Sequence, residues 1–275
     1  MRRSPSLARW LPPAIDEQLR RLCGRGVHYR GDFPTWSLAS ARTTGYDAQN
    51  ILQQVRAAAL QVKVGTAAYE RDSVLFDHIH HSFPVLAGLL RAAAEAESRL
   101  AVLDLGGALG SSYYQCRDFL AVVSSLRWGV VEQPHFVKCG KAEFQDGTLQ
   151  FFDSLAECLT TISPNVVLLS SVLQYLPDPA EILKIIQDSA VRYVIIDRTP
   201  FSDLDSDHIT TQHVPKSIYA ASYPCWIFSR FNLVQRFGPS YQLLAEFDSS
   251  DGRARTEQID FSFGGMILRN VCSAA

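Results

Sequence analysis

The chain has 275 residues, of which 47% are hydrophobic and 20% charged, and its 26 basic and 28 acidic residues give a net charge of −2. This composition can supply a full core and excludes a low-complexity disordered chain, and the charge balance argues against a general nucleic-acid-binding protein. Its apolar runs are too short for a membrane helix, which needs about 18 residues. The six cysteines match neither a zinc spacing nor a dense disulfide framework, which favours a cytoplasmic protein with free thiols.

The first third of the chain is expected to form a basic tail followed by a helical cap. Residues 1–32 are rich in arginine and lack the continuous apolar segment of a signal peptide. Residues 33–98 show helical periodicity, with predicted helices at 51–62, around 73–79 and at 84–94; Asp47 is expected to cap the first helix and Gly65 to end it. Because this segment directly precedes the first predicted strand, we expect it to close a ligand site against water.

Beyond residue 98, strand and helix patterns alternate. Strands are predicted at 100–105, 128–131, 149–152, 166–169 and 193–196. The intervening helices include 111–126, a helix capped by Ser154 with Glu157 three residues later, and a helix opened by Asp178 and Pro179. This alternation predicts an α/β fold with a doubly wound, Rossmann-like sheet of five parallel strands.

The last quarter of the chain departs from that alternation. Residues 198–224 show no clear periodicity and are expected to form a long loop, after which Ser229 is expected to cap a short helix ending at Gly238. Strands are predicted at 241–247 and 259–268, and their connection is too short for a parallel crossover, so they must form an antiparallel hairpin. The sheet is therefore expected to have seven strands, and residues 99–275 to form one ligand-binding domain.

The segment VLDLGGALG places three glycines between a predicted strand and a predicted helix, where they let the backbone approach a ligand closely. Asp104, at the end of this strand, would repel the pyrophosphate of a dinucleotide but suits a cationic ligand such as S-adenosylmethionine (SAM). Glu132, at the end of the second strand, can accept hydrogen bonds from both hydroxyls of a ribose. The pattern therefore favours SAM over a nicotinamide cofactor.

These residues resemble the D-x-G-x-G-x-G motif of the class I SAM-dependent methyltransferases, with Ala108 in place of the middle glycine. The usual aspartate or asparagine after the fourth strand is absent. The resemblance implies a set of SAM-binding residues: Asp104, Gly106, Gly107 and Gly110 for the methionine end, Glu132 for the ribose, Asp153 and Ser154 for the adenine, and Ser170 after the fourth strand.

Longer stretches are similar to a little-characterised group of bacterial methyltransferases that is often associated with surface-polysaccharide biosynthesis. They include YERDSVLFD, VVEQPHFV, LLSSVLQYL, IIDRTPF and SIYAASYPCWIF. The similarity implies a small-molecule or glycan-precursor acceptor and O-methylation of a sugar.

A hydroxyl acceptor needs a proton acceptor near the site of transfer, and ligands of doubly wound sheets bind at the carboxyl ends of the strands. His135 and Asp197 both follow predicted strands and are the candidate catalytic residues. Arg198 could bind an anionic acceptor. The candidates for a wall of the substrate site are polar and aromatic residues in and just after the long loop: Gln212, Tyr219, Tyr223 and Trp226. No metal site is expected, because the three histidines at 78–81 are spaced too closely to share one helix face.

Two alternatives remain open from the sequence. No single catalytic residue stands out, which leaves room for a non-catalytic SAM-binding or interaction module on the same fold. A nicotinamide-dependent oxidoreductase is opposed by Asp104 and by the lack of a clean G-x-G-x-x-G. The acceptor, the methylated atom and the oligomeric state have no recognisable signature.

Overall fold

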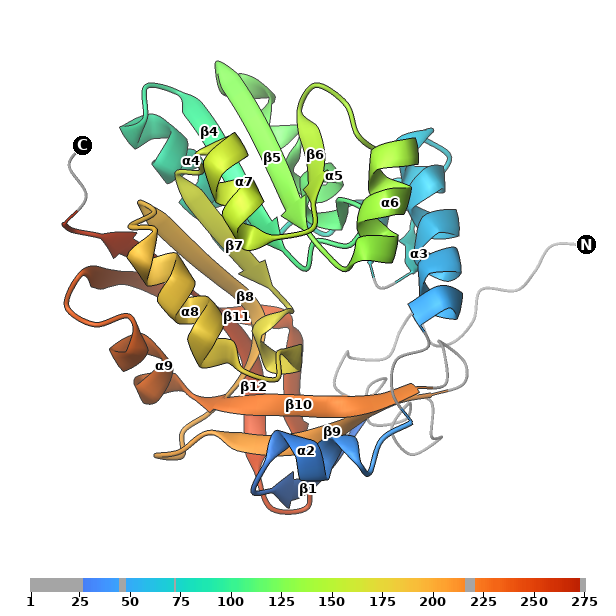
Figure 1. The fold of residues 1–275 in the computed structure, drawn as a ribbon, viewed down its shortest axis with the longest axis vertical. Coiled ribbons are helices and arrows are strands. Elements are labelled where there is room, and N and C mark those ends of the chain that lie inside the picture. Colours follow the sequence, from blue (N-terminus) through green and yellow to red (C-terminus); the bar gives the residue numbers. More distant parts are fainter. Residues whose placement is uncertain (1–26, 45–47, 72, 216–220, 273–275) are drawn as a thin grey trace, which may run out of the picture.

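The structure, a computed structural model, describes residues 27–44, 48–71, 73–215 and 221–272. These residues form a mixed ten-stranded sheet and a separate two-stranded hairpin, with helices on both faces of the sheet (Figure 1). The strand order is β1-β9-β10-β8-β7-β4-β5-β6, and β12 pairs with β8 and β11. The predicted α/β class with a doubly wound sheet is confirmed. The expected count of seven strands is wrong, because β1, β9 and β10 extend the sheet.

The core of the sheet is parallel and buried on both faces. Adjacent residues such as Val102 and Leu103 contact different hydrophobic clusters, one on each side of the sheet. One face is covered by helices α3 (Ala48–Lys63), α4 (Phe83–Glu95), α5 (Ser111–Cys116) and α6 (Pro134–Glu143). The other face is covered by α7 (Leu155–Ile162), α8 (Pro179–Asp188) and α9 (Arg230–Arg236). The parallel strands are β4 (Arg99–Leu105), β5 (Ser125–Val131), β6 (Leu149–Phe152), β7 (Val166–Ser170) and β8 (Tyr193–Ser202).

Capping residues fix several helix starts as predicted. The side chain of Ser154 accepts a hydrogen bond from the N–H of Glu157 at 3.2 Å, and Asp178 and Ser229 cap α8 and α9 in the same manner. The predicted 111–126 helix is wrong in length, since α5 ends at Cys116 and a short 3-10 helix (Phe119–Val122) follows. The chain must turn there to enter β5. The expected cap Asp47 lies outside the described residues.

The terminal hairpin is antiparallel, as predicted. It consists of β11 (Tyr241–Arg255) and β12 (Asp260–Asn270), and β12 also pairs antiparallel with β8. Strand β11 continues well beyond its predicted end, because a register shift between Asp248 and Arg253 carries the pairing past the turn-rich segment. This continuation brings residues 248–254 to the carboxyl ends of the parallel strands.

Residues 198–224 do not form the expected long loop. Strand β8 runs on to Ser202, and β9 (His208–Val214) and β10 (Ala221–Ser229) follow as an antiparallel pair. Strand β1 (His28–Phe33) pairs with the outer edge of β9, and α2 (Trp36–Ser40) contacts both β9 and β10. We call residues 28–40, 198–215 and 221–229 the antiparallel lobe; it lies below the parallel strands in Figure 1.

The segment expected to be an entirely helical cap also contains strands. The predicted helix around 73–79 is wrong: β2 (Tyr69–Arg71) and β3 (Val74–Phe76) form a hairpin there, and Ser73 adopts a φ of 65° in its turn. Residues 28–32 belong to β1 rather than to a tail, and residues 1–26 of the expected basic tail lie outside the described residues.

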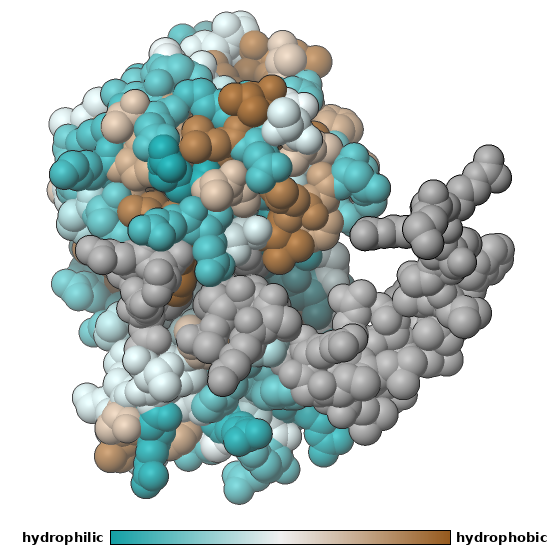
Figure 2. All heavy atoms as spheres, turned by 90° about the vertical axis from the view of Figure 1, so that its right-hand side faces the viewer, coloured by the Kyte–Doolittle hydropathy of each residue, from teal (hydrophilic) through white to brown (hydrophobic). Residues whose placement is uncertain are grey.

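The face shown in Figure 2 mixes hydrophilic residues with small hydrophobic groups on its upper part. Among the described residues, the most exposed apolar side chains in helices are those of Val122, Phe231 and Phe83, with 76%, 71% and 63% of their surface accessible. None of the helices that the structure describes has the length and apolar character needed to cross a membrane.

Candidate functional site

A pocket of about 1620 Å³ opens at the carboxyl ends of the parallel strands. Its walls come from the segments that follow β4, β5, β6 and β7, from strands β8, β9, β10 and β11, and from the N-terminal segment that includes the β2–β3 hairpin. A pocket for a single small ligand usually has a volume of about 300–1,000 Å³. The pocket therefore has room for two ligands side by side, and we name its two parts after the strands that form them: the β4–β6 end and the β8–β10 end.

The glycine loop lies between β4 and α5, where the sheet order reverses direction. Strand β5 lies on one side of β4 and β7 on the other, so this is the switch point at which doubly wound sheets bind ligands. Gly106 and Ala108 take left-handed φ values of 71° and 51°. A Cβ atom on Gly107 would come within 2.4 Å of Oδ2 of Asp104, so only glycine fits at this position. Gly106 and Gly107 line the pocket, whereas Gly110 starts the helix behind it.

Asp104 lies behind the loop rather than against the pocket. Its side chain is 1% exposed, and Nε1 of Trp128 donates a hydrogen bond to Oδ2 at 3.1 Å. Oδ1 is buried without a hydrogen-bond partner among the described residues. Burial raises the pKa of Asp104 from 3.8 to about 7, although the hydrogen bond from Trp128 acts in the opposite direction. The geometry gives Asp104 the position of a buried support for the loop, not that of a direct ligand contact.

Two other carboxylates face the pocket beside the loop. Glu132 follows β5 and accepts a hydrogen bond from the N–H of Gln133 at 2.6 Å; burial raises its pKa, while backbone N–H groups oppose that effect. Glu70, on β2, is only 2% exposed and accepts hydrogen bonds from the hydroxyl of Ser111 and, at 3.2 Å, from the N–H of Ser73. Sequence reasoning missed Glu70, since this residue lies just before the helix expected around 73–79 and belongs to no motif with a stated role.

The two residues after β6 have different positions. Asp153 lines the pocket, half-exposed, with Nζ of Lys141 at 3.6 Å from its carboxylate. Ser154 is not among the residues that line the pocket, and its hydroxyl is engaged as the cap of α7. Of this predicted adenine-contacting pair, only Asp153 is placed to touch a ligand.

Asp197 and Ser170 lie opposite each other where the adjacent strands β8 and β7 reach the pocket. The hydroxyl of Ser170 donates a hydrogen bond to Oδ2 of Asp197 at 3.2 Å, and both side chains line the pocket. Asp197 is 5% exposed; burial raises its pKa, against the opposing effects of Arg198 and Ser170. The adjoining Ser171 and Arg198 have φ values of 55° and 51°. Left-handed backbone at non-glycine residues is strained and concentrates at functional sites.

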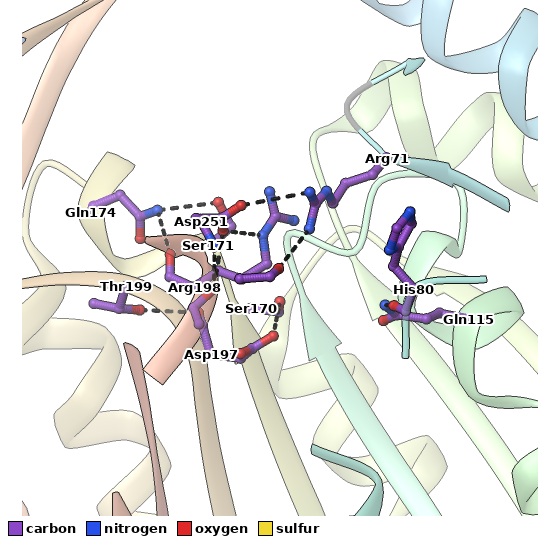
Figure 3. A network of polar contacts seen from close by, with 12 residues as sticks. Arg71, His80, Gln115, Ser170, Ser171, Gln174, Asp197, Arg198, Thr199 and Asp251 are labelled. Atoms are coloured by element: carbon purple, nitrogen blue, oxygen red, sulfur yellow. Dashed lines mark hydrogen bonds and ion pairs between the residues drawn. The ribbon is translucent and has the colours of Figure 1, made fainter. Parts of the chain in front are cut away.

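A network of charged groups occupies the β8–β10 end (Figure 3). Nε of Arg198 donates a hydrogen bond to Oδ2 of Asp251 at 2.9 Å, and Nη2 of Arg71 lies 3.7 Å from Oδ1 of the same carboxylate. All three side chains line the pocket. They come from β8, β11 and the β2–β3 hairpin, and Arg71 and Asp251 were not predicted from the sequence.

Gln212 and Tyr223 face the same end of the pocket, as the sequence suggested. The hydroxyl of Tyr175 donates to Oε1 of Gln212 at 3.0 Å, and Nε2 of Gln212 donates to the hydroxyl of Tyr223 at 3.3 Å. The rings of Tyr175 and Tyr223 meet edge to face, 5.2 Å apart. Tyr175, a residue that sequence reasoning missed, thus completes a wall with aromatic faces and polar groups.

Trp226 is turned away from the pocket. Its indole N–H donates to the carbonyl of Leu176 at 3.0 Å, and its ring stacks on that of Trp36. It has the contacts of a packing residue, which does not support its expected role in a substrate wall. Tyr219 lies outside the described residues.

The geometry gives no support to a catalytic role for His135. The side chain lies on α6, its Nε2 is buried without a hydrogen-bond partner among the described residues, and it does not line the pocket. His80 and His81 do line the pocket, although neither was singled out for the site. No group of three or more potential metal ligands is found within the described ranges.

No protein-family model matches the sequence. No curated protein matches it either. Among solved structures, the N-terminal domain of EvdMO1, crystallised with SAH and D-fucose, is similar at 15% identity, over 82% of this chain and 97% of that one, with a TM-score of 0.43. An amino pentose methyltransferase from Micromonospora echinaspora, CalS10, is similar at 11% identity, over 70% and 93%, with a TM-score of 0.42. A SAM-dependent methyltransferase from Clostridium acetobutylicum is similar at 11% identity, over 67% and 90%, with a TM-score of 0.40.

Proposed function

We propose that this protein is a SAM-dependent methyltransferase that O-methylates a sugar or another small polar acceptor in glycan biosynthesis. The observation that carries the proposal is the glycine loop at the switch point of the sheet, which opens on a pocket flanked by the carboxylates Glu70 and Glu132. A pyrophosphate would be repelled there, whereas a ligand with an ammonium group, a sulfonium and a ribose would be favoured. The motif resemblance supports the same cofactor.

The residues of the β4–β6 end fit the parts of SAM. The carboxylate of Glu132 would accept hydrogen bonds from the ribose hydroxyls, and Asp153 would contact the adenine. Backbone groups of Gly106 and Gly107 would hold the methionine end, with the buried carboxylate of Glu70 beside its ammonium group. Asp104 would act indirectly, by supporting the loop from behind.

The bound cofactor supplies an electrophilic methyl group, and the protein must place the acceptor in line with it. Asp197 is the residue best placed to take the proton of an acceptor hydroxyl. It lines the pocket, and burial raises its pKa toward the range in which a carboxylate is an effective general base. Ser170 orients this carboxylate through its hydrogen bond to Oδ2.

The wall formed by Tyr175, Gln212 and Tyr223 suits a sugar ring. Aromatic faces contact the apolar side of such a ring, and the hydroxyl and amide groups offer polar partners to its edge. The N-terminal segment supports the proposed role of a cap, because Glu70, His80 and His81 all reach the pocket. The cysteines that the structure describes are all free thiols, which fits a reducing, cytoplasmic setting.

Two measurements test the proposal. Isothermal titration calorimetry should show SAM binding, and mass spectrometry should detect a methylated product when the protein and SAM are incubated with a panel of sugars and nucleotide sugars. Binding of a nicotinamide dinucleotide in place of SAM would overturn the proposal. SAM binding without any methylated product across the panel would favour a non-catalytic binding module.

A further inference from the structure

Two arginines share one carboxylate at the β8–β10 end of the pocket. Asp251 receives the hydrogen bond of Arg198 at 2.9 Å and lies 3.7 Å from a guanidinium nitrogen of Arg71. Nη1 of Arg71 also lies 3.5 Å from the hydroxyl of Ser250. The side chains of Arg71, Arg198 and Asp251 are 24%, 20% and 22% exposed, so each keeps part of its surface toward the pocket. Figure 3 shows both guanidinium groups beside the carboxylate.

This group carries an excess of positive charge. Burial raises the pKa of Asp251, but Arg198 and Arg71 outweigh that effect and hold it below its ordinary value, so Asp251 stays ionised near neutral pH. One negative charge then faces two positive ones. The other charged groups on this wall, Asp248 and Arg253 of β11, offset each other.

Asp197 is a further charged neighbour of Arg198. The hydroxyl of Ser170 donates a hydrogen bond to its carboxylate, and burial raises its pKa, while the charge and the backbone N–H of Arg198 act in the opposite direction. The pocket thus presents a buried carboxylate directly beside the two arginines.

The backbone conformation at Arg198 lets the side chains of Asp197 and Arg198 both line the pocket, although they are consecutive residues. Consecutive residues of a regular strand point to opposite faces of a sheet. Asp197 and Arg198 nevertheless both line the pocket, and Arg198 has a left-handed φ of 51° that interrupts the alternation. Such a conformation is unfavourable for arginine, and persists only where the surrounding structure holds it. Here it places the side chain of Arg198 next to that of Arg71, which comes from a distant part of the chain.

We infer that Arg71 and Arg198 bind an oxyanion of the acceptor, a phosphate or carboxylate group, while a hydroxyl of the same molecule lies at Asp197. This inference rests on the proposed function and narrows its acceptor to an anionic, hydroxylated molecule, such as a sugar phosphate or a sugar acid. Guanidinium groups present paired N–H donors that match both kinds of oxyanion. Asp251 holds the two cations together and yields part of its contacts when the oxyanion binds.

The test measures oxyanion binding without SAM. Wild-type protein is titrated at low ionic strength with inorganic phosphate, inorganic diphosphate and glucuronate by isothermal titration calorimetry. Arg198→Gln and Arg71→Gln should each weaken binding about tenfold or more. Asp251→Asn should strengthen it several-fold, because it removes the competing carboxylate. Arg236→Gln is the matched control, since Arg236, on α9, pairs with Asp207 and does not line the pocket; it should bind as the wild type does.

Because the arginine variants should weaken oxyanion binding and Asp251→Asn should strengthen it, the test remains informative if one arginine variant is unstable. The inference is overturned if no oxyanion binds the wild type, or if the arginine and aspartate variants all bind as tightly as the wild type, which would make the network a purely structural contact. A stronger response to phosphate and diphosphate than to glucuronate assigns the group to a phosphate, and the reverse assigns it to a carboxylate. SAM binding is measured on the same samples. If the wild type binds SAM but no oxyanion, this inference alone is overturned. If the wild type does not bind SAM, the proposed function is overturned.

Discussion

The two ends of the pocket are built from different kinds of structure. The β4–β6 end follows successive parallel strands, and its polar groups stand on turns whose positions are set by the strand ends. The β8–β10 end combines an extended β8, two antiparallel strands, the far part of β11 and the β2–β3 hairpin. The first arrangement suits a ligand common to many proteins of this fold class, and the second suits a ligand particular to this one. Variants at each end should therefore separate cofactor binding from acceptor chemistry.

The largest expected effect concerns the buried carboxyl group behind the glycine loop. The folded-state pKa of Asp104 is raised from 3.8 to about 7, so the folded protein holds this proton over a pH range in which the unfolded chain releases it. Its contribution to the free energy of unfolding should therefore fall by about 4 kcal/mol as the pH rises from about 4 to about 7, and then level off.

This effect is measured as the difference between wild type and Asp104→Asn in urea unfolding at a series of pH values. Asparagine can still accept the hydrogen bond of Trp128, and other titrating groups are common to both proteins, so the difference isolates Asp104. Parallel stability curves for the two proteins across this range would contradict the prediction. They would mean that the pKa of Asp104 is not raised in the folded protein.

The next effect tests the chemistry assigned to the β8–β10 end. Asp197→Asn keeps the shape of the side chain but removes its proton-accepting charge, so the rate of methyl transfer should fall about 100-fold, while SAM affinity is retained. In the wild type the rate should rise with pH through the raised pKa of Asp197, because the base must be deprotonated. Single-turnover kinetics measure the rate, and Asp260→Asn, at a strongly exposed aspartate, is the control. A rate unchanged in Asp197→Asn would require another base.

A smaller effect tests the β4–β6 end. Glu132→Ala removes the carboxylate proposed to hold the ribose, and charge-assisted hydrogen bonds contribute roughly 1.5–3 kcal/mol each, so SAM affinity should fall more than tenfold. Calorimetry measures the dissociation constant, and circular dichroism checks the fold. Glu97→Ala, at a residue whose side chain is 83% exposed, should leave affinity unchanged. Equal SAM affinity in wild type and Glu132→Ala would mean that the cofactor lies elsewhere.

The smallest effect separates two aromatic residues of β10. Tyr223→Phe removes only the hydroxyl that receives the hydrogen bond of Gln212, and should raise the KM for the acceptor by about three- to tenfold without changing SAM affinity. Trp226→Phe should instead lower the melting temperature and change the acceptor KM less, because Trp226 does not line the pocket itself and packs behind the lining residues Trp36 and Leu176. If Trp226→Phe shifts KM as much as Tyr223→Phe does, the boundary of the acceptor site is drawn wrongly.

The sequence was most informative where local rules decide the structure. Helix caps such as Ser154 with Glu157 need only neighbouring residues, and apolar runs buried on both faces mark the parallel strands directly. The same holds for the glycine loop and for Glu132 at the end of β5. Most of the β4–β6 end of the site was therefore predictable, apart from the side-chain directions of Asp104 and Ser154.

The β8–β10 end depended on contacts that are distant along the chain. Strand β9 carries the polar residues Thr210, Thr211 and Gln212, all buried, so neither an alternating nor an apolar pattern marks it. The hairpin strand that holds Glu70 and Arg71 is three residues long. Their positions follow from tertiary pairing, which sequence periodicity does not report.

The pairing of β1 with β9 joins residues near the start of the chain to residues near its end; the hydrogen bond between Thr44 and Ser222 spans 178 positions, and that between Gly31 and Glu257 spans 226. Strands β4 to β8, by contrast, follow one another along the chain with only helices and short connections between them. Long-range pairing is slow to form because a large loop must close first. On the ribosome, the βα units can assemble as they emerge, whereas the antiparallel lobe must wait until β9 and β10 have been synthesised. We therefore expect the β4–β6 end of the pocket to form first in a newly made chain, and the β8–β10 end, which is proposed to select the acceptor, to form last.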